Sequence, residues 1–120
     1  GNPFISPELC LHFQYFGLRK MHFLLRARAL VAFPGGFGTL DELFEVLTLV
    51  QTGEVGRLPI VLVGTAFWRR AIDFEFLASE GVINAEDLEL FSVVDTAEEI
   101  VERLHAFYGG KPPEPASDAT

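Results

Sequence analysis

The sequence predicts an α/β domain in which a parallel sheet carries helices on both of its faces. Short apolar runs at 30–33, 58–63 and 91–94 alternate with longer segments of helical apolar spacing, and this alternation is typical of a parallel sheet. The run at 58–63 is apolar throughout, as strands buried on both faces are. A glycine-rich turn at 34–38 joins the first predicted strand to the helix that follows it. We therefore expect about three strands and four helices.

The four helices are expected at 8–29, 39–51, 65–79 and 97–107, with a short helical turn at 84–90. In the last three helices, apolar residues recur at the three- and four-residue intervals that mark one face of a helix. The first helix is apolar and aromatic on most of its sides. We therefore expect it to be buried against a second subunit or against another part of the same protein.

The 120 residues have the length of one domain or of part of one. The sequence begins Gly1-Asn2-Pro3 and passes almost directly into the apolar segment, which predicts that it comes from the interior of a longer protein. A sheet of about three strands is small for this fold class, so further strands are expected upstream. We predict that 1–110 form the C-terminal part of a single domain, and that the Pro-rich, polar residues 111–120 form a disordered tail.

Composition excludes several classes of function. The formal net charge of −8 argues against a nucleic-acid partner, because such proteins carry a basic surface. The single cysteine, Cys10, excludes an internal disulfide and fits a cytoplasmic location. No apolar run of about 18 residues predicts a membrane span, and no secretory signal precedes the domain. The histidines His12, His22 and His105 lack metal-ligand spacing, so we predict no metal and no other cofactor.

The most informative segment is Pro34–Glu42, which reads Pro-Gly-Gly-Phe-Gly-Thr-Leu-Asp-Glu. A turn at the start of a helix offers free backbone N–H groups and the positive end of the helix dipole, and both favour a phosphate. Gly35, Gly36 and Gly38 would let the phosphate approach the backbone, and Thr39 is expected to cap the helix and to donate its hydroxyl to the phosphate. The segment is neither a Walker P-loop nor a Gly-x-Gly-x-x-Gly dinucleotide motif. A tight strand-to-helix turn without a ligand is the alternative interpretation.

Carboxylates follow this turn closely. Glu42 lies one turn into the predicted helix, where a carboxylate beside a phosphate pocket suggests acid–base chemistry. The alternative for Glu42 is a capping box with Thr39, which has the required Thr-x-x-Glu spacing. Glu45 lies one turn further on the same face. It is interpreted as a partner of Glu42 in acid–base chemistry, as a contact to sugar hydroxyls, or as a solvent-exposed charge of the helix. Asp41 is expected to face the solvent or to interact with the helix dipole.

The pair Arg19-Lys20 and the Pro34–Glu42 motif resemble the Lonely Guy family. The spacing between the pair and the motif is also similar to that in the family's pattern. Members of this family are cytokinin-activating nucleoside 5′-monophosphate phosphoribohydrolases that are often labelled lysine decarboxylases. The resemblance extends over about 1–108 and covers the C-terminal part of the family's domain. It implies a modified Rossmann-like, doubly wound parallel sheet. It also implies a homodimer or a larger oligomer built from dimers.

The resemblance also implies a reaction. An AMP-like nucleoside 5′-monophosphate would be hydrolysed at its N-glycosidic bond to ribose 5-phosphate and a free base, adenine or an N6-modified adenine. The catalytic pair would be Arg19 and Glu42. The phosphate and nucleotide contacts would come from a larger set, namely Gly35, Gly36, Gly38, Thr39, Lys20 and Glu45.

Physical chemistry agrees with these roles. Cleavage of an N-glycosidic bond develops positive charge on the sugar, and a carboxylate such as Glu42 stabilises that charge and orients or deprotonates the attacking water. An adjacent Arg19 would lower the pKa of Glu42 and keep it ionised. The decarboxylase label is disfavoured, because a pyridoxal-phosphate enzyme needs a Schiff-base lysine and the sequence holds only Lys20 and Lys111.

Two alternatives to the enzyme stay open at this stage. The first is a nucleotide-binding Rossmann module without turnover, which would need the turn but not the whole set Arg19, Thr39 and Glu42. The second is that the 120 residues are an inactive, truncated fragment with an orphaned apolar helix.

Overall fold

A computed structural model describes residues 29–109 of the chain, and their element order agrees with the α/β prediction. The predicted helix before Ala29, the residues Arg19 and Lys20, and the tail 111–120 lie outside the described residues. The elements in chain order are β1 (Leu30–Ala32), α3 (Phe37–Gln51), β2 (Ile60–Val63), α4 (Thr65–Ala71), α5 (Phe74–Ser79), the 3₁₀ helix η1 (Ala85–Leu90), β3 (Ser92–Val94) and α6 (Ala97–Tyr108).

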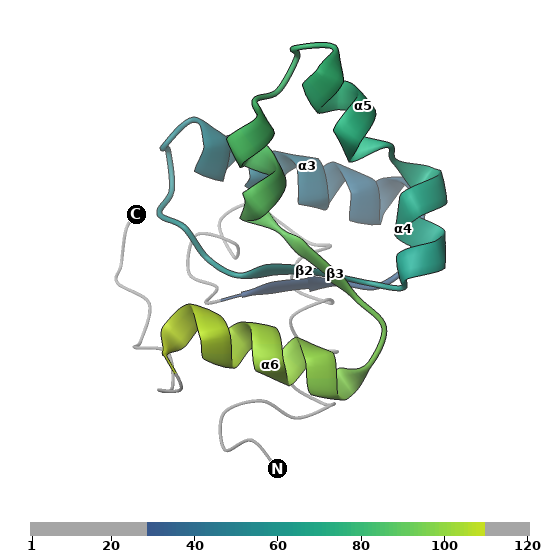
Figure 1. Cartoon of the computed structure of the whole chain (residues 1–120), viewed down its shortest axis with the longest axis vertical. Helices are drawn as coiled ribbons and strands as arrows, with labels where there is room; N and C mark the ends of the chain where they lie inside the picture. Colours follow the sequence, from purple (N-terminus) through teal and green to yellow (C-terminus); the bar gives the residue numbers. More distant parts are fainter. Residues whose placement is uncertain (1–28, 110–120) are drawn as a thin grey trace.

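The three strands form a parallel sheet in the order β1-β2-β3, as predicted. Val31 pairs with Val61 between the first two strands, and Val61 pairs with Ser92 between the next two. Figure 1 shows α6 on one side of this sheet and α3, α4 and α5 on the other. The predicted doubly wound arrangement is thus confirmed in the part of the domain that the structure describes.

Alternate residues of each strand face the two helical layers. Val31 and Val61 are fully buried on the α6 side, in one cluster with Ile100 and Leu104 of that helix. Val63 of β2 belongs to the same cluster, whereas the alternate residues of β1 and β2 lie on the α3 side, packed with buried residues from α3 and α4. That second cluster contains Leu30, Ala32, Ile60, Leu62, Leu43, Val46, Val50 and Trp68. Continuous apolar strands are therefore required by burial on both faces rather than by strand pairing alone.

The single helix predicted for 65–79 is wrong. The chain leaves the helix at Ile72, which is extended at φ −142° and ψ 127°, and a second helix begins at Phe74. Asp73 caps this second helix, because its carboxylate accepts a hydrogen bond of 3.0 Å from the Phe76 N–H. Apolar spacing cannot report the break, since the local hydrogen bond of the Asp73 side chain competes with the helix at one residue. None of the helices within 29–109 is long and apolar enough to cross a membrane.

Packing of α3 on the sheet can be tested with one matched pair of substitutions. Val46→Ala removes two carbons from a side chain that is 2 % exposed, and we expect it to lower the free energy of unfolding by about 2 kcal/mol. Val82→Ala makes the same change at a side chain that is 68 % exposed, and it should cost less than about 0.5 kcal/mol. Urea denaturation of both variants in the full-length protein measures the difference. Equal losses would contradict the observed burial.

Candidate functional site

The glycine turn lies between the end of β1 and the start of α3, at the edge of the sheet where the parallel strands end. Gly36 is the N-cap of α3, with φ −93° and ψ −147°, and its carbonyl accepts a hydrogen bond of 3.1 Å from the Leu40 N–H. The helix therefore begins at Phe37, two residues before the predicted start at Thr39. Parallel pairing brings the ends of all three strands to this edge, which is where ligands of open α/β sheets bind.

The predicted cap by Thr39 is wrong, and so is the capping box between Thr39 and Glu42. Both residues lie inside α3, and the N-cap residue Gly36 has no side chain with which to make a capping hydrogen bond. Thr39 is instead buried, with 7 % of its surface exposed, against the backbone of the turn. A Cβ at Gly35 would clash with the Thr39 hydroxyl oxygen. Glycine at 35 thus lets the turn fold back onto its own helix.

Within residues 29–109, α3 is the one α-helix whose N-terminus has no side-chain acceptor. The Asp95 carboxylate accepts a hydrogen bond of 2.8 Å from the Thr65 N–H at the start of α4. Asp73 caps α5, and Thr96 caps α6 by accepting from a backbone N–H at 3.1 Å. These hydrogen bonds occupy the positive ends of the other helices. Among the residues that the structure describes, no side chain occupies the amides at the start of α3.

Two of the turn's glycines are not explained by the described structure. A Cβ at Gly36 or at Gly38 would meet nothing within 4 Å, and neither glycine has a positive φ. Gly38 also lies inside the first turn of a helix, where glycine is unfavourable by about 1 kcal/mol relative to alanine. Open space beside these two residues is what the close approach of a ligand to the backbone requires.

Glu42 is a buried carboxylate without a described partner. Its side chain is 6 % exposed, and its Oε2 atom makes no hydrogen bond within the described part of the chain. Burial raises the pKa of the Glu42 carboxyl above its ordinary value of 4.5, and the neighbouring Glu45 and Asp41 carboxylates raise it further. An ionised carboxylate in this position calls for a cation, because an unpaired buried charge is costly. The predicted cation is Arg19, which lies outside the described residues.

Three acidic side chains, two from the motif and Glu45 one turn further on, lie close together on α3. Asp41, Glu42 and Glu45 can each offer one carboxylate oxygen, and the three oxygens lie within 4.8 Å of one another. Asp41 is exposed, as predicted, and Glu45 is half-buried. Carboxylate oxygens are ligands that Mg²⁺ and Ca²⁺ accept, but acidic side chains one turn apart on a helix also lie this close without an ion. Three carboxylates this close together repel one another when ionised, so the site needs positive charge to compensate them.

The structure brings together most of the residues predicted for the site. The three glycines, Thr39, Glu42 and Glu45 all lie in the turn or in the first half of α3. The sequence analysis did not predict that the corner between β2 and α4 contacts the turn. In this corner, Gly64 lies against Pro34, and the Thr65 hydroxyl donates a hydrogen bond to Asp95. The available signal was position: Gly64 and Asp95 each follow directly after a predicted parallel strand, at the edge to which the turn belongs.

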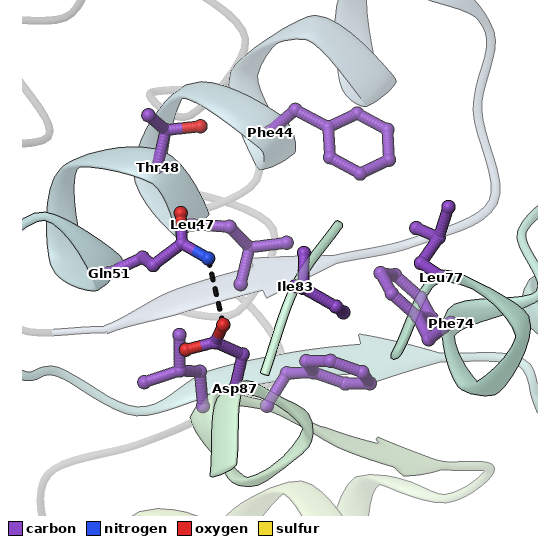
Figure 2. Close-up of a pocket in the computed structure, with 10 residues that line it drawn as sticks. Phe44, Leu47, Thr48, Gln51, Phe74, Leu77, Ile83 and Asp87 are labelled. Atoms are coloured by element: carbon purple, nitrogen blue, oxygen red, sulfur yellow. Dashed lines mark hydrogen bonds between the residues drawn. The ribbon is translucent and has the colours of Figure 1, made fainter. Parts of the chain in front are cut away.

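A separate cavity of about 90 Å³ lies between α3, α5 and η1, and none of the turn residues lines it. Figure 2 shows Phe44, Leu47 and Phe74 around this space, with the hydrogen bond from Gln51 to Asp87 at its margin. That bond is 2.8 Å long and ties η1 to the C-terminal half of α3. The lining is mostly apolar, so the cavity offers few groups with which to orient a polar ligand.

Comparison with known proteins agrees with this geometry. Residues 5–104 match the sequence profile of the family described as "Possible lysine decarboxylase". The chain belongs to this family. The predicted resemblance to Lonely Guy proteins is confirmed, because the chain is 32 % identical over 91 residues to "Cytokinin riboside 5'-monophosphate phosphoribohydrolase LOG3" of Arabidopsis thaliana. It is 34 % identical over 91 residues to "Cytokinin riboside 5'-monophosphate phosphoribohydrolase LOG" of Oryza sativa subsp. japonica.

Both alignments cover 74 % of this chain, but only 42 % of the Arabidopsis protein and 37 % of the rice protein. The chain thus spans about two fifths of the length of these curated relatives. The names of the relatives state a phosphoribohydrolase, whereas the family description states a decarboxylase. The described residues hold no lysine for a Schiff base, since the sequence has only Lys20 and Lys111.

The coupling between the acidic side chains can be measured directly. Glu45→Gln removes one like charge beside Glu42, so the ionised form becomes more favourable and we expect the pKa of Glu42 to fall towards its ordinary value. A carbon-13 NMR titration of the Glu42 carboxyl carbon reports this shift. Glu102→Gln, at an exposed position of α6, is the matched control and should leave that pKa unchanged. An unchanged pKa in the Glu45 variant would contradict the proximity.

Proposed function

We propose that the protein hydrolyses the N-glycosidic bond of an AMP-like nucleoside 5′-monophosphate, releasing ribose 5-phosphate and adenine or an N6-modified adenine. The observation that carries the proposal is the buried Glu42 carboxylate, whose Oε2 atom has no hydrogen-bond partner within residues 29–109, one turn inside a helix whose N-terminus no described side chain caps. The printed names of the relatives support the same reaction.

The phosphate is proposed to bind at the start of α3. Backbone N–H groups of the first turn point out of the helix end, and no side chain in the described residues occupies them. Open space at Gly36 and Gly38 admits phosphate oxygens close to the backbone. Thr39 is proposed to contribute its hydroxyl as well as its packing against Gly35. Anchoring the phosphate fixes the sugar, and this remote binding energy then serves the chemical step.

Glu42 is proposed to stabilise the oxocarbenium-like sugar and to orient or deprotonate the attacking water. A carboxylate does this best in a site shielded from solvent, where its charge is not screened by water. It must be ionised, while burial and two neighbouring carboxylates raise its pKa. We propose that the Arg19 guanidinium supplies the compensating positive charge and lowers that pKa again. Glu45 is proposed to contact the ribose hydroxyls, and Lys20 to contact the nucleotide.

Hydrolysis of this bond needs only water and side chains, so the proposal includes no cofactor. We further propose that the protein acts in the cytoplasm as a homodimer or as a larger oligomer built from dimers. The cytoplasmic location is proposed from the single cysteine, and the oligomer from the resemblance to the Lonely Guy family.

Replacing the carboxylate tests the chemistry. Glu42→Gln keeps the size of the side chain and removes its charge, and we expect the rate of base release to fall by at least about 10²-fold while nucleotide binding persists. Chromatography of free base formed from AMP and from isopentenyl-AMP measures the rate in the full-length protein. Glu102→Gln on α6 is the matched control and should retain the parent rate. Unchanged turnover in the Glu42 variant would refute the assigned role.

The same assay separates the enzyme from a binding module. If the parent protein binds AMP but releases no base, the proposal is replaced by that of a nucleotide-binding module without turnover. If Glu42→Gln and the parent release base equally, another group performs the chemistry.

Replacing Gly38 separates binding from stability. Gly38→Ala places a methyl group in open space within a helix, so we expect the free energy of unfolding to rise by about 1 kcal/mol. The same methyl group would obstruct the phosphate, and the KM for AMP should rise by about tenfold or more. Gly56→Ala, also in open space but outside α3, is the control that should leave the KM unchanged. A more stable variant with the parent KM would place the phosphate elsewhere.

A further inference from the structure

The glycine turn is in contact with the corner that joins β2 to α4. A Cβ at Gly64 would lie 3.2 Å from the Cγ atom of Pro34 and 3.6 Å from its Cδ atom. The Gly64 backbone therefore lies directly against the ring of the first residue of the turn. Gly64 has φ +106°, a conformation that side-chain-bearing residues rarely adopt. The conformation thus favours glycine at this position, and a Cβ would also press against Pro34.

Hydrogen bonds hold this corner on both sides of Gly64. Its N–H donates to the Val94 carbonyl at 2.7 Å, and its carbonyl accepts from the Trp68 N–H at 3.0 Å. Trp68 is itself fixed, because its indole N–H donates to the Val63 carbonyl at 2.9 Å in the buried core. The corner is therefore attached to β3, to β2 and to α4 at once.

The next residue is held by a carboxylate from the end of β3. The Thr65 N–H and the Thr65 hydroxyl each donate a hydrogen bond of 2.8 Å to Asp95, one to each carboxylate oxygen. The Asp95 N–H in turn donates to the Glu99 carboxylate at 2.9 Å, which fixes Asp95 to the start of α6. These hydrogen bonds keep the Asp95 carboxyl in its charged form and its pKa low. A continuous series of contacts thus runs from α6 through Asp95 and Thr65 to Gly64 and Pro34.

The turn has few restraints of its own. Within residues 29–109 no side chain caps α3, and a Cβ at Gly36 or Gly38 would meet nothing within 4 Å. The described contacts that hold the turn are the backbone hydrogen bond from the Leu40 N–H to the Gly36 carbonyl, the packing of Gly35 on Thr39 and the contact of Pro34 with Gly64. A site that lacks internal support depends on neighbouring rigid elements for its geometry.

We propose that Gly64, Thr65 and Asp95 are positioning residues that fix the glycine turn, through Pro34, in the geometry that accepts a phosphate. None of the three is proposed to touch the substrate. The proposal rests on the proposed function for the identity of the ligand, but the coupling between the corner and the turn is a property of the protein alone. A misplacement of about 1 Å at a binding group far from the reacting atoms can cost about a hundredfold in rate.

The test compares two glycines that share a left-handed conformation and differ in their neighbours. Gly64→Ala places a methyl group against Pro34, whereas Gly53→Ala, at φ +79°, places it in open space just beyond the C-terminal end of α3. Both substitutions force alanine into a positive-φ conformation, so both should lower the melting temperature. Only Gly64→Ala should disturb the glycine turn.

Two readouts in the full-length protein separate the coupling from the function. Hydrogen exchange of a peptide covering 34–42, measured relative to one covering 60–63, reports the turn without any ligand. Calorimetry with AMP and with adenosine, made in the Glu42→Gln background so that AMP is turned over at least about 10²-fold more slowly, reports phosphate binding, because the two ligands differ only in that group. We expect Gly64→Ala to accelerate hydrogen exchange selectively in 34–42. We also expect it to raise the Kd for AMP by about tenfold or more, while the Kd for adenosine stays unchanged.

Each outcome decides one of the two proposals. Equal exchange in the turn for Gly64→Ala and Gly53→Ala would overturn the positioning role. Selective exchange with a parent protein that binds no AMP would uphold the coupling and refute the proposed function. If Gly64→Ala does not fold, Thr65→Val removes only the hydroxyl bond to Asp95 and Thr65→Ser restores it. Weaker AMP binding in Thr65→Val that Thr65→Ser does not recover would also count against the role.

Discussion

Parallel pairing of three buried strands is the constraint on which the rest of this structure depends. Each strand must be followed by a chain that crosses back over a face of the sheet, and helices satisfy this requirement while covering the apolar faces. The crossovers begin at one edge, so the first residues of α3, α4 and α6 all start there. Every feature assigned to the candidate site follows from the convergence of these three helix starts at one edge.

The three helix starts are treated differently, and that difference defines the site. Side chains from the protein itself satisfy the starts of α4 and α6, through Asp95 and through Thr96 with Glu99. The start of α3 is left unsatisfied by the described residues, although a serine or aspartate at position 36 would cap it. One substitution would stabilise this helix end, yet no described side chain caps it. An uncapped helix N-terminus of this kind is typical of an anion-binding site.

Glu42 carries a cost that the fold has to accommodate. Because burial and two like charges raise its folded pKa, the group favours the folded state most below pH 4.5, and this contribution is lost as the pH rises through the raised pKa. At neutral pH the ionised carboxylate therefore destabilises the described part of the domain unless a cation joins it. Buried groups that destabilise a fold are typical of sites that perform chemistry. A positively charged partner such as Arg19 would reduce this cost and keep the carboxylate ionised.

The sequence by itself determined the fold class, the strands and the position of the turn. Burial on both faces imposes an apolar run at 58–63, and paired glycines at 35 and 36 between a strand and a helix are typical of a turn. Only the tertiary structure decided that α3 starts at Phe37, that Glu42 is buried while Asp41 is exposed, and that Asp95 holds Thr65. The last two residues are 30 positions apart in the chain. Local patterns record the periodicity of an element, whereas the end of a helix and the burial of one carboxylate depend on which distant groups fold against them.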